Sequence, residues 1–126
     1  MKLKSAAGVV CYVKDLSQTI PFYEKLGFQF KTKEQTRATA YLNWWWLDFH
    51  QADAAGDAPA WHMPPDIDNA GSGSLFYFSV ENINKAYEEV TASGLRPASE
   101  PVALRGNKEF MLVDPDGYRL VFFTRK

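Results

Sequence analysis

Residues 107–123 read NKEFMLVDPDGYRLVFF, with two apolar runs on either side of an Asp-Pro-Asp-Gly motif. In this motif Pro115 presets one turn residue, Gly117 supplies a positive φ angle, and the Asp side chains cap the backbone. The stretch therefore predicts a β-hairpin whose strands lie inside a sheet. Side chains alternate along a strand, so the hairpin has two faces. The core face is expected to hold Phe110, Leu112, Leu120 and Phe122, and the other face Glu109, Met111, Val113, Arg119, Val121 and Phe123.

Composition is typical of a single globular domain. The chain has 126 residues, of which 46% are hydrophobic and 23% charged, and this length buries a substantial core without covalent staples. The formal net charge of −1, with scattered Lys and Arg, argues against nucleic acid or a membrane surface as a partner. A single cysteine, Cys11, excludes an internal disulfide, and the first residues do not resemble a signal peptide, so we expect a cytoplasmic protein. No apolar run reaches the roughly 18 residues of a membrane span.

Four landmarks indicate an internal repeat. Asp15 and Gly27 are expected to begin and end a helix, with Ser17 as an alternative cap, and Asn82 and Gly94 have the same separation. The repeat predicts a unit of strand, helix and three strands that is present twice. The first unit has strands at residues 8–13, 29–31, 38–42 and 44–50, and the second has a strand at residues 75–80, a helix at about residues 84–93 and the terminal hairpin.

The predicted fold class is α+β, in a single domain of residues 1–126. Two tandem βαβββ modules occupy residues 5–50 and 75–126, and residues 51–74 connect them. This connection is rich in Ala, Asp, Pro and Gly, and a connection of such length in a compact domain is usually a lid, a binding loop or a linker. It contains Trp61. A Trp in a polar loop requires burial, so we expect the loop to fold back over another surface.

The order of elements and four short motifs resemble the vicinal oxygen chelate superfamily. The motifs are VKDL at residues 13–16, FYEKLGF at 22–28, EF at 109–110 and DPDG at 114–117. This superfamily includes the glyoxalases, the bleomycin-resistance proteins, fosfomycin-inactivating thiol transferases and extradiol dioxygenases. The resemblance implies two βαβββ modules whose curled sheets enclose a cavity, often shared between the two chains of a dimer. It does not fix the activity, because one scaffold supports several chemistries.

The resemblance also implies where the metal ligands of the metal-dependent members would fall. These positions are Gly8, Leu75 and Val121, with Asp48 as the remaining one. A divalent metal in an enzyme site needs about three protein ligands with N, O or S atoms. A lone carboxylate does not supply them, and neither His50 nor His62 falls at an expected position. We therefore expect no metal and no other cofactor.

An aromatic cleft is the alternative use of the cavity. If Asp48 faces the cavity, alternation places Trp44, Trp46 and His50 on the same face. Aromatic walls suit planar or cationic ligands through stacking and cation–π attraction, and carboxylates then fix the orientation of the ligand. The expected ligand is therefore a small aromatic or cationic molecule. The predicted ligand-binding residues are Val10, Tyr12, Trp44, Trp46, Asp48, His50, Trp61, Tyr77, Glu109, Met111, Arg119 and Phe123.

Several functions stay open on these residues. The leading hypothesis is a homodimeric, metal-independent binding protein that sequesters a small molecule, similar to the bleomycin-resistance branch and suited to antibiotic or toxin resistance. The alternative is a lyase, transferase or isomerase of the superfamily, with a metal on Asp48 and His50 or with acid/base chemistry by Asp48, Glu109 or Tyr12. A third is a partner-binding protein without a small ligand. The strand that holds the Trp residues at 44–46 could equally be buried on both faces, one in the core and one in a dimer interface. Arg119 and Glu109 could form a cross-strand ion pair with no role in ligand binding.

Overall fold

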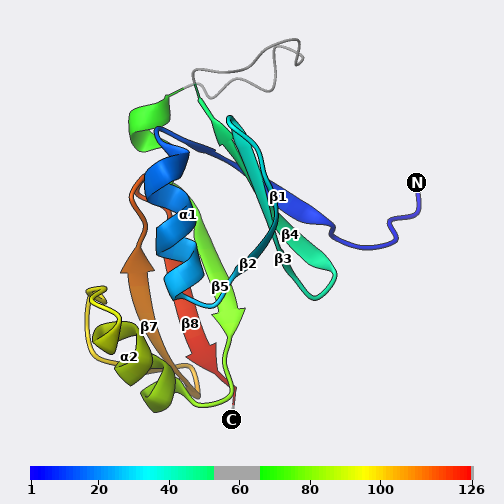
Figure 1. Ribbon diagram of the computed structural model, residues 1–126. Coiled ribbons are helices and arrows are strands. Elements are labelled where there is room, and N and C mark those ends of the chain that lie inside the picture. The colour runs from blue at the N-terminus through cyan, green and yellow to red at the C-terminus, as the bar shows by residue number, and fades with distance from the viewer. Residues whose placement is uncertain (53–65, 126) are drawn as a thin grey trace. The chain divides into compact units, whose positions relative to one another are not determined.

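The computed structural model describes residues 1–52 and 66–125 (Figure 1). Trp61 and His62 lie outside these residues, as does most of the predicted connecting loop. The chain forms two compact units, Met1–Ala70 and Gly71–Lys126. Among the helices of the described ranges, none is long and apolar enough to cross a membrane.

The first unit is a four-stranded sheet with one long helix. The strand order is β1-β4-β3-β2, in which β1 runs parallel to β4 and the other pairs are antiparallel. Tyr23 of the helix is fully buried, and its ring lies 4.6 Å from that of Phe49, so the helix packs on the face of the sheet that carries Phe49. The elements are β1 (Gly8–Val13), α1 (Leu16–Lys25), β2 (Gln29–Lys33), β3 (Arg37–Leu42), β4 (Trp45–Gln51) and the short η2 (Ile67–Asn69).

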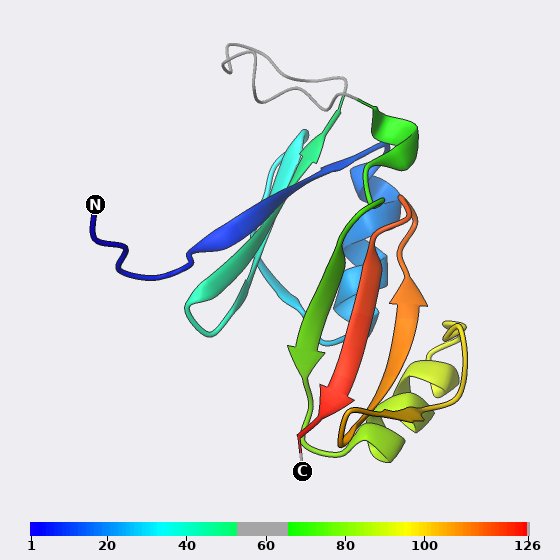
Figure 2. The same ribbon diagram turned by 180° about the vertical axis from the view of Figure 1, so that it is seen from behind.

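The second unit has the same arrangement, with strand order β5-β8-β7-β6 and β5 parallel to β8. Figure 2 shows β5 in green, β8 in red and β7 in orange side by side. The helix α2 contacts β7 and β8, and the ring of Tyr87 lies 5.5 Å from that of Phe110. The elements are β5 (Leu75–Ser79), α2 (Ile83–Ala92), β6 (Val102–Leu104), β7 (Asn107–Val113) and β8 (Arg119–Thr124).

The terminal hairpin is confirmed, because β7 and β8 pair antiparallel around the Asp-Pro-Asp-Gly motif. Asp114 accepts hydrogen bonds from the backbone N–H groups of Asp116 (2.8 Å) and Tyr118 (2.9 Å), and Gly117 has a φ angle of 90°. Val121 belongs to the opposite face from the core but is also buried, since it lies between β5 and β7 in the middle of the sheet. The four residues predicted for the core are all buried: Phe110, Leu112, Leu120 and Phe122.

The repeat is visible in the ends of the two helices. Asp15 caps the N-terminus of α1 and Asn82 that of α2, each by accepting a backbone hydrogen bond with its side chain. Gly27 and Gly94, just beyond the helices, have φ angles of 95° and 92°. These conformations favour glycine, which ends a helix at little steric cost. The α+β fold of two βαβββ modules is therefore confirmed.

Candidate functional site

The predicted site residues of the first unit lie on the face of its sheet opposite α1. Side chains alternate along β1 and β4, so Phe49 and the other fully buried residues of these strands point toward the helix. The half-buried residues between them point away from it. The strands pair in register, so Val10 lies beside Asp48 and Tyr12 beside His50. The residues of this set are half-buried: Val10, Tyr12, Trp46, Asp48 and His50.

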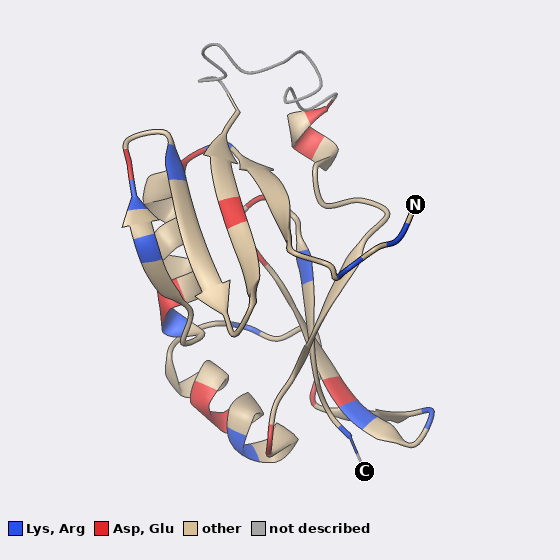
Figure 3. Cartoon of the chain, turned by 90° about the vertical axis from the view of Figure 1, so that its right-hand side faces the viewer, with Lys and Arg blue, Asp and Glu red and all other residues tan. Residues whose placement is uncertain are grey.

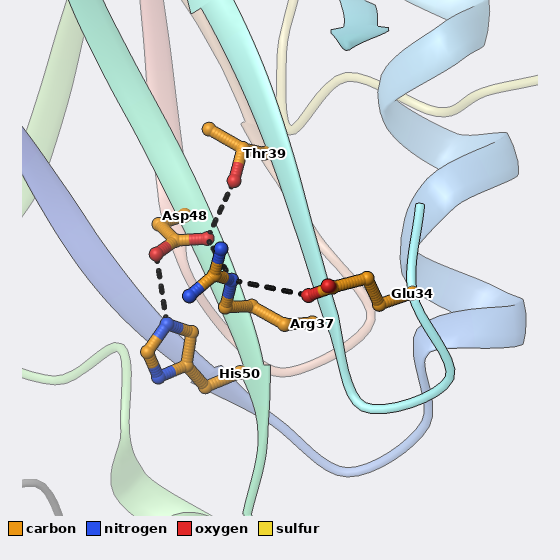
Figure 4. A network of polar contacts seen from close by, with 5 residues as sticks. All are labelled: Glu34, Arg37, Thr39, Asp48 and His50. Carbon is orange, nitrogen blue, oxygen red and sulfur yellow. Dashed lines mark hydrogen bonds and ion pairs between the residues drawn. The ribbon is translucent and has the colours of Figure 1, made fainter. Parts of the chain in front are cut away.

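Asp48 is the centre of a polar network on this face (Figure 4). Its Oδ1 accepts a hydrogen bond of 2.8 Å from the hydroxyl of Thr39, and its Oδ2 lies 2.8 Å from Nε2 of His50. The Nε atom of Arg37 lies 3.7 Å from Asp48 Oδ1 and 3.6 Å from Glu34 Oε2. Because the Asp48 side chain is only 15% exposed, these contacts replace most of its hydration. The network holds the carboxylate in one orientation.

Tyr12 completes the network on the side of β1. Its ring meets that of His50 edge to face, with centroids 5.9 Å apart and an interplanar angle of 89°. Burial raises the pKa of Tyr12 above its ordinary value. A phenol with a raised pKa keeps its proton at neutral pH. Tyr12 is therefore suited to donate a hydrogen bond and to offer its ring, and it is not a base as it stands.

Trp44 does not belong to this face, and the prediction that it lies in the strand was wrong. Leu42 pairs with Trp45, which leaves Asn43 and Trp44 as a two-residue turn between β3 and β4. Asn43 has a φ angle of 56°, which Asn tolerates in such turns, and Trp44 is 92% exposed.

The second unit carries the other predicted residues on the face of its sheet opposite α2. The hydroxyl of Tyr77 donates to Glu109, at 3.2 Å from Oε2 and 3.4 Å from Oε1. The ring of Tyr77 meets that of Phe123 at 5.7 Å with an interplanar angle of 65°. Loss of hydration raises the pKa of Tyr77, and the Glu109 carboxylate raises it further by its charge and its hydrogen bond. The remaining members of this set are Met111 and Arg119, both half-buried.

Glu109 and Arg119 are not opposite each other in the sheet. Glu109 pairs with Phe123, whereas Arg119 pairs with Val113 and Leu75. The simple ion pair considered from the sequence is therefore replaced by the contact between Glu109 and Tyr77. Acidic and basic positions are interspersed along both units (Figure 3).

The residues at the implied ligand positions do not fit a metal ion. Gly8 has no side chain, Leu75 is an exposed hydrocarbon, and Val121 is buried in the sheet. Asp48 could offer oxygen atoms, but both are engaged by its neighbours. Over residues 1–52 and 66–125, no group of three His, Cys, Asp or Glu side chains is placed to hold a metal ion.

Thr39 and Arg37 are the residues of the first face that the sequence did not single out. Both lie on β3, where antiparallel pairing sets Thr39 beside Asp48 and Arg37 beside His50. Strand alternation places them on this face only once that register is known. The signal in the sequence that could have assigned them to this face is that both are polar residues in a short strand.

Comparison with known proteins decides the family. The sequence profile of the Glyoxalase/Bleomycin resistance protein/Dioxygenase superfamily matches residues 6–122. The chain belongs to this superfamily. A search of curated proteins gave no match.

Solved structures share the superfamily fold over almost the whole chain. A virulence protein from Salmonella typhimurium is 26% identical, with a TM-score of 0.81 and coverage of 100% of both chains. An integron cassette protein from the mobile metagenome of V. cholerae is 23% identical, with a TM-score of 0.81 and coverage of 100% of this chain and 98% of that one. A glyoxalase/bleomycin resistance protein/dioxygenase from Nocardioides is 17% identical, with a TM-score of 0.83 and coverage of 99% and 85%.

Proposed function

We propose that this chain is a metal-independent binding protein of the cytoplasm that, as a homodimer, sequesters a small planar aromatic or cationic molecule. The observation that carries the proposal is the face of the first unit, where Tyr12 and Trp46 flank a carboxylate whose orientation is fixed. Gly8, Leu75 and Val121 supply no ligating atom at the positions where metal-dependent members of the superfamily have theirs. Antibiotic or toxin resistance is the role that such sequestration would serve.

The chemistry of this face favours planar ligands. Each aromatic contact contributes about 0.5–1.5 kcal/mol beyond the burial of its area. Tyr12 adds a further ring beside the imidazole of His50, which it meets edge to face. Since Asp48 is held by Thr39 and His50, it orients the imidazole and does not have to reorganise when a ligand binds.

Tryptophan fluorescence tests the proposal directly. We expect N-methylacridinium, a planar cation, to quench the fluorescence saturably and with a defined stoichiometry. Trp46→Leu should weaken the binding at least several-fold, whereas Trp44→Leu, in the exposed turn, is the matched control and should leave the affinity unchanged. A flat titration with this probe and with a broad panel of aromatic compounds would contradict the proposal, as would a stoichiometric metal found by elemental analysis.

One observation favours a second function, acid/base catalysis without a family-type metal site. The contact of 2.8 Å between Asp48 and His50 Nε2 orients the imidazole, as a catalytic dyad requires. An enzyme of this kind would be a lyase, a transferase or an isomerase, and it would convert a substrate of one of these classes. Its activity would be lost in His50→Gln with binding retained, and that pair of results would displace the sequestration proposal.

A further inference from the structure

A cation of the chain itself already lies on the aromatic face of the second unit. The guanidinium carbon of Arg125 is 5.8 Å from the centroid of the Phe123 ring, within the range of cation–π attraction. Arg125 follows Phe123 by two positions, so both side chains leave the extended chain on the same side. The contact therefore belongs to the face that also carries Tyr77 and Glu109.

The backbone around this contact is fixed by Val80. The N–H of Val80 donates to the carbonyl of Phe123 at 2.8 Å, and the Thr124 hydroxyl donates to the carbonyl of Val80 at 3.2 Å. These two bonds hold Phe123 and Thr124, the two residues that precede Arg125. The Arg125 side chain itself is exposed, so it can leave the ring without disturbing the sheet.

The groups around Phe123 are suited to a positive charge. Glu109 pairs with Phe123 in the register of β7 and β8, and it accepts the hydrogen bond of Tyr77. A phenol that donates to a carboxylate carries more electron density in its ring, which strengthens its attraction for a cation. Tyr77 remains 49% exposed, and its ring meets that of Phe123 edge to face. Two rings and a carboxylate thus lie next to one another on this face.

We propose that Phe123, Tyr77 and Glu109 form a position on the second unit that binds an organic cation, and that Arg125 is a resident cation which this ligand displaces. The proposal rests on the binding function proposed above for the class of its ligand, and it needs only groups of the second unit. The chain then carries its own weak competitor. In the free protein, Arg125 is the cation that lies over the Phe123 ring.

Removal of the competitor is the test. With the full chain, we expect Arg125→Ala to bind N-methylacridinium about two- to five-fold more tightly, the change expected from one exposed cation–π contact. Arg96→Ala is the matched control, because it removes the same charge from another exposed position of the second unit and should change nothing. Neutral acridine, measured at a pH where it is unprotonated, should bind the wild type and Arg125→Ala equally. Phe123→Leu and Glu109→Gln should weaken the binding of the cation.

A second measurement does not depend on that affinity. The δ protons of Arg125 should show an upfield ring-current shift by NMR that is lost in Phe123→Leu and on addition of N-methylacridinium.

The displacement proposal would be overturned if Arg125→Ala bound N-methylacridinium with unchanged affinity, or if the variant gained as much affinity for neutral acridine. In either case, saturable binding of N-methylacridinium to the wild type would leave the binding function standing. Tighter binding of anthracene carboxylate than of N-methylacridinium by the wild type would overturn the choice of a cation. The absence of binding by every variant would overturn both proposals.

Discussion

The indole of Trp46 lies directly over Gly8 across the parallel pair of β1 and β4. A Cβ atom added to Gly8 would be 2.2 Å from Cδ2 of Trp46 and 2.5 Å from the Trp46 carbonyl oxygen. Contacts this short cannot be relieved by rotating the indole alone, because one of the two atoms belongs to the backbone. The implied ligand position on β1 is thus filled by an aromatic ring and closed to any side chain.

Gly8→Ala should therefore destabilise the protein by about 1–3 kcal/mol, the usual cost of an overpacked site. The measurement is urea unfolding, with the free energy of unfolding compared at equal slope. In a chain that already carries Trp46→Leu, Gly8→Ala should still lower the free energy of unfolding, but by less than it does in the wild type. Part of the loss stays because the contact with the carbonyl oxygen remains. A single variant as stable as the wild type would show that the two strands can separate freely at this point.

Asp48→Ala should cost about 1–3 kcal/mol of stability, since the Thr39 hydroxyl and the His50 imidazole both lose a partner in a half-buried place. Urea unfolding again gives the value. Glu34→Ala is the control, because it breaks only an exposed ion pair with Arg37 and should change the free energy of unfolding by about 0.5 kcal/mol or less. Equal effects of the two variants would mean that the Asp48 network does not order this face.

The two helix caps should contribute equally if the modules are true repeats. Asp15→Ala and Asn82→Ala each remove one side-chain acceptor for the backbone at a helix N-terminus, and each should cost about 1 kcal/mol. Asp15→Asn and Asn82→Asp exchange the two caps and should be nearly neutral in thermal unfolding. A large loss at one cap only would show that the equivalent positions have different roles.

The sequence was sufficient for the features that depend on near neighbours. Asp114 and Gly117 define a turn within a few residues, and Asp15 caps its helix through the N–H of Ser17, so each is readable locally. The alternation of Phe110 and Leu112 likewise shows its core face without knowledge of the partner strand.

Features that depend on register were not readable. Trp44 looks like a strand residue until the pairing of Leu42 with Trp45 makes it part of a turn. Thr39 meets Asp48 from the neighbouring strand, and nothing in the spacing of the two residues announces the contact. The edge strand β6 has three exposed residues, Val102–Leu104, so it shows no apolar alternation.

Titration of Tyr77 tests the electrostatics of the second face. Its pKa is raised by loss of hydration and by Glu109, so the unfolded chain releases this proton at a lower pH than the folded protein does. The stabilising effect is therefore complete below the ordinary tyrosine pKa of about 10 and is lost as the pH rises through the higher pKa of the folded state. Glu109→Gln should move the pKa of Tyr77 down toward its ordinary value and make the alkaline loss of stability less steep. The Cζ chemical shift of Tyr77, followed by NMR against pH, measures the pKa, and Glu89→Gln on the exposed side of α2 is the control with the same change of charge. If Tyr77 titrates at the same pH in the wild type and in Glu109→Gln, the hydrogen bond between them does not persist in solution.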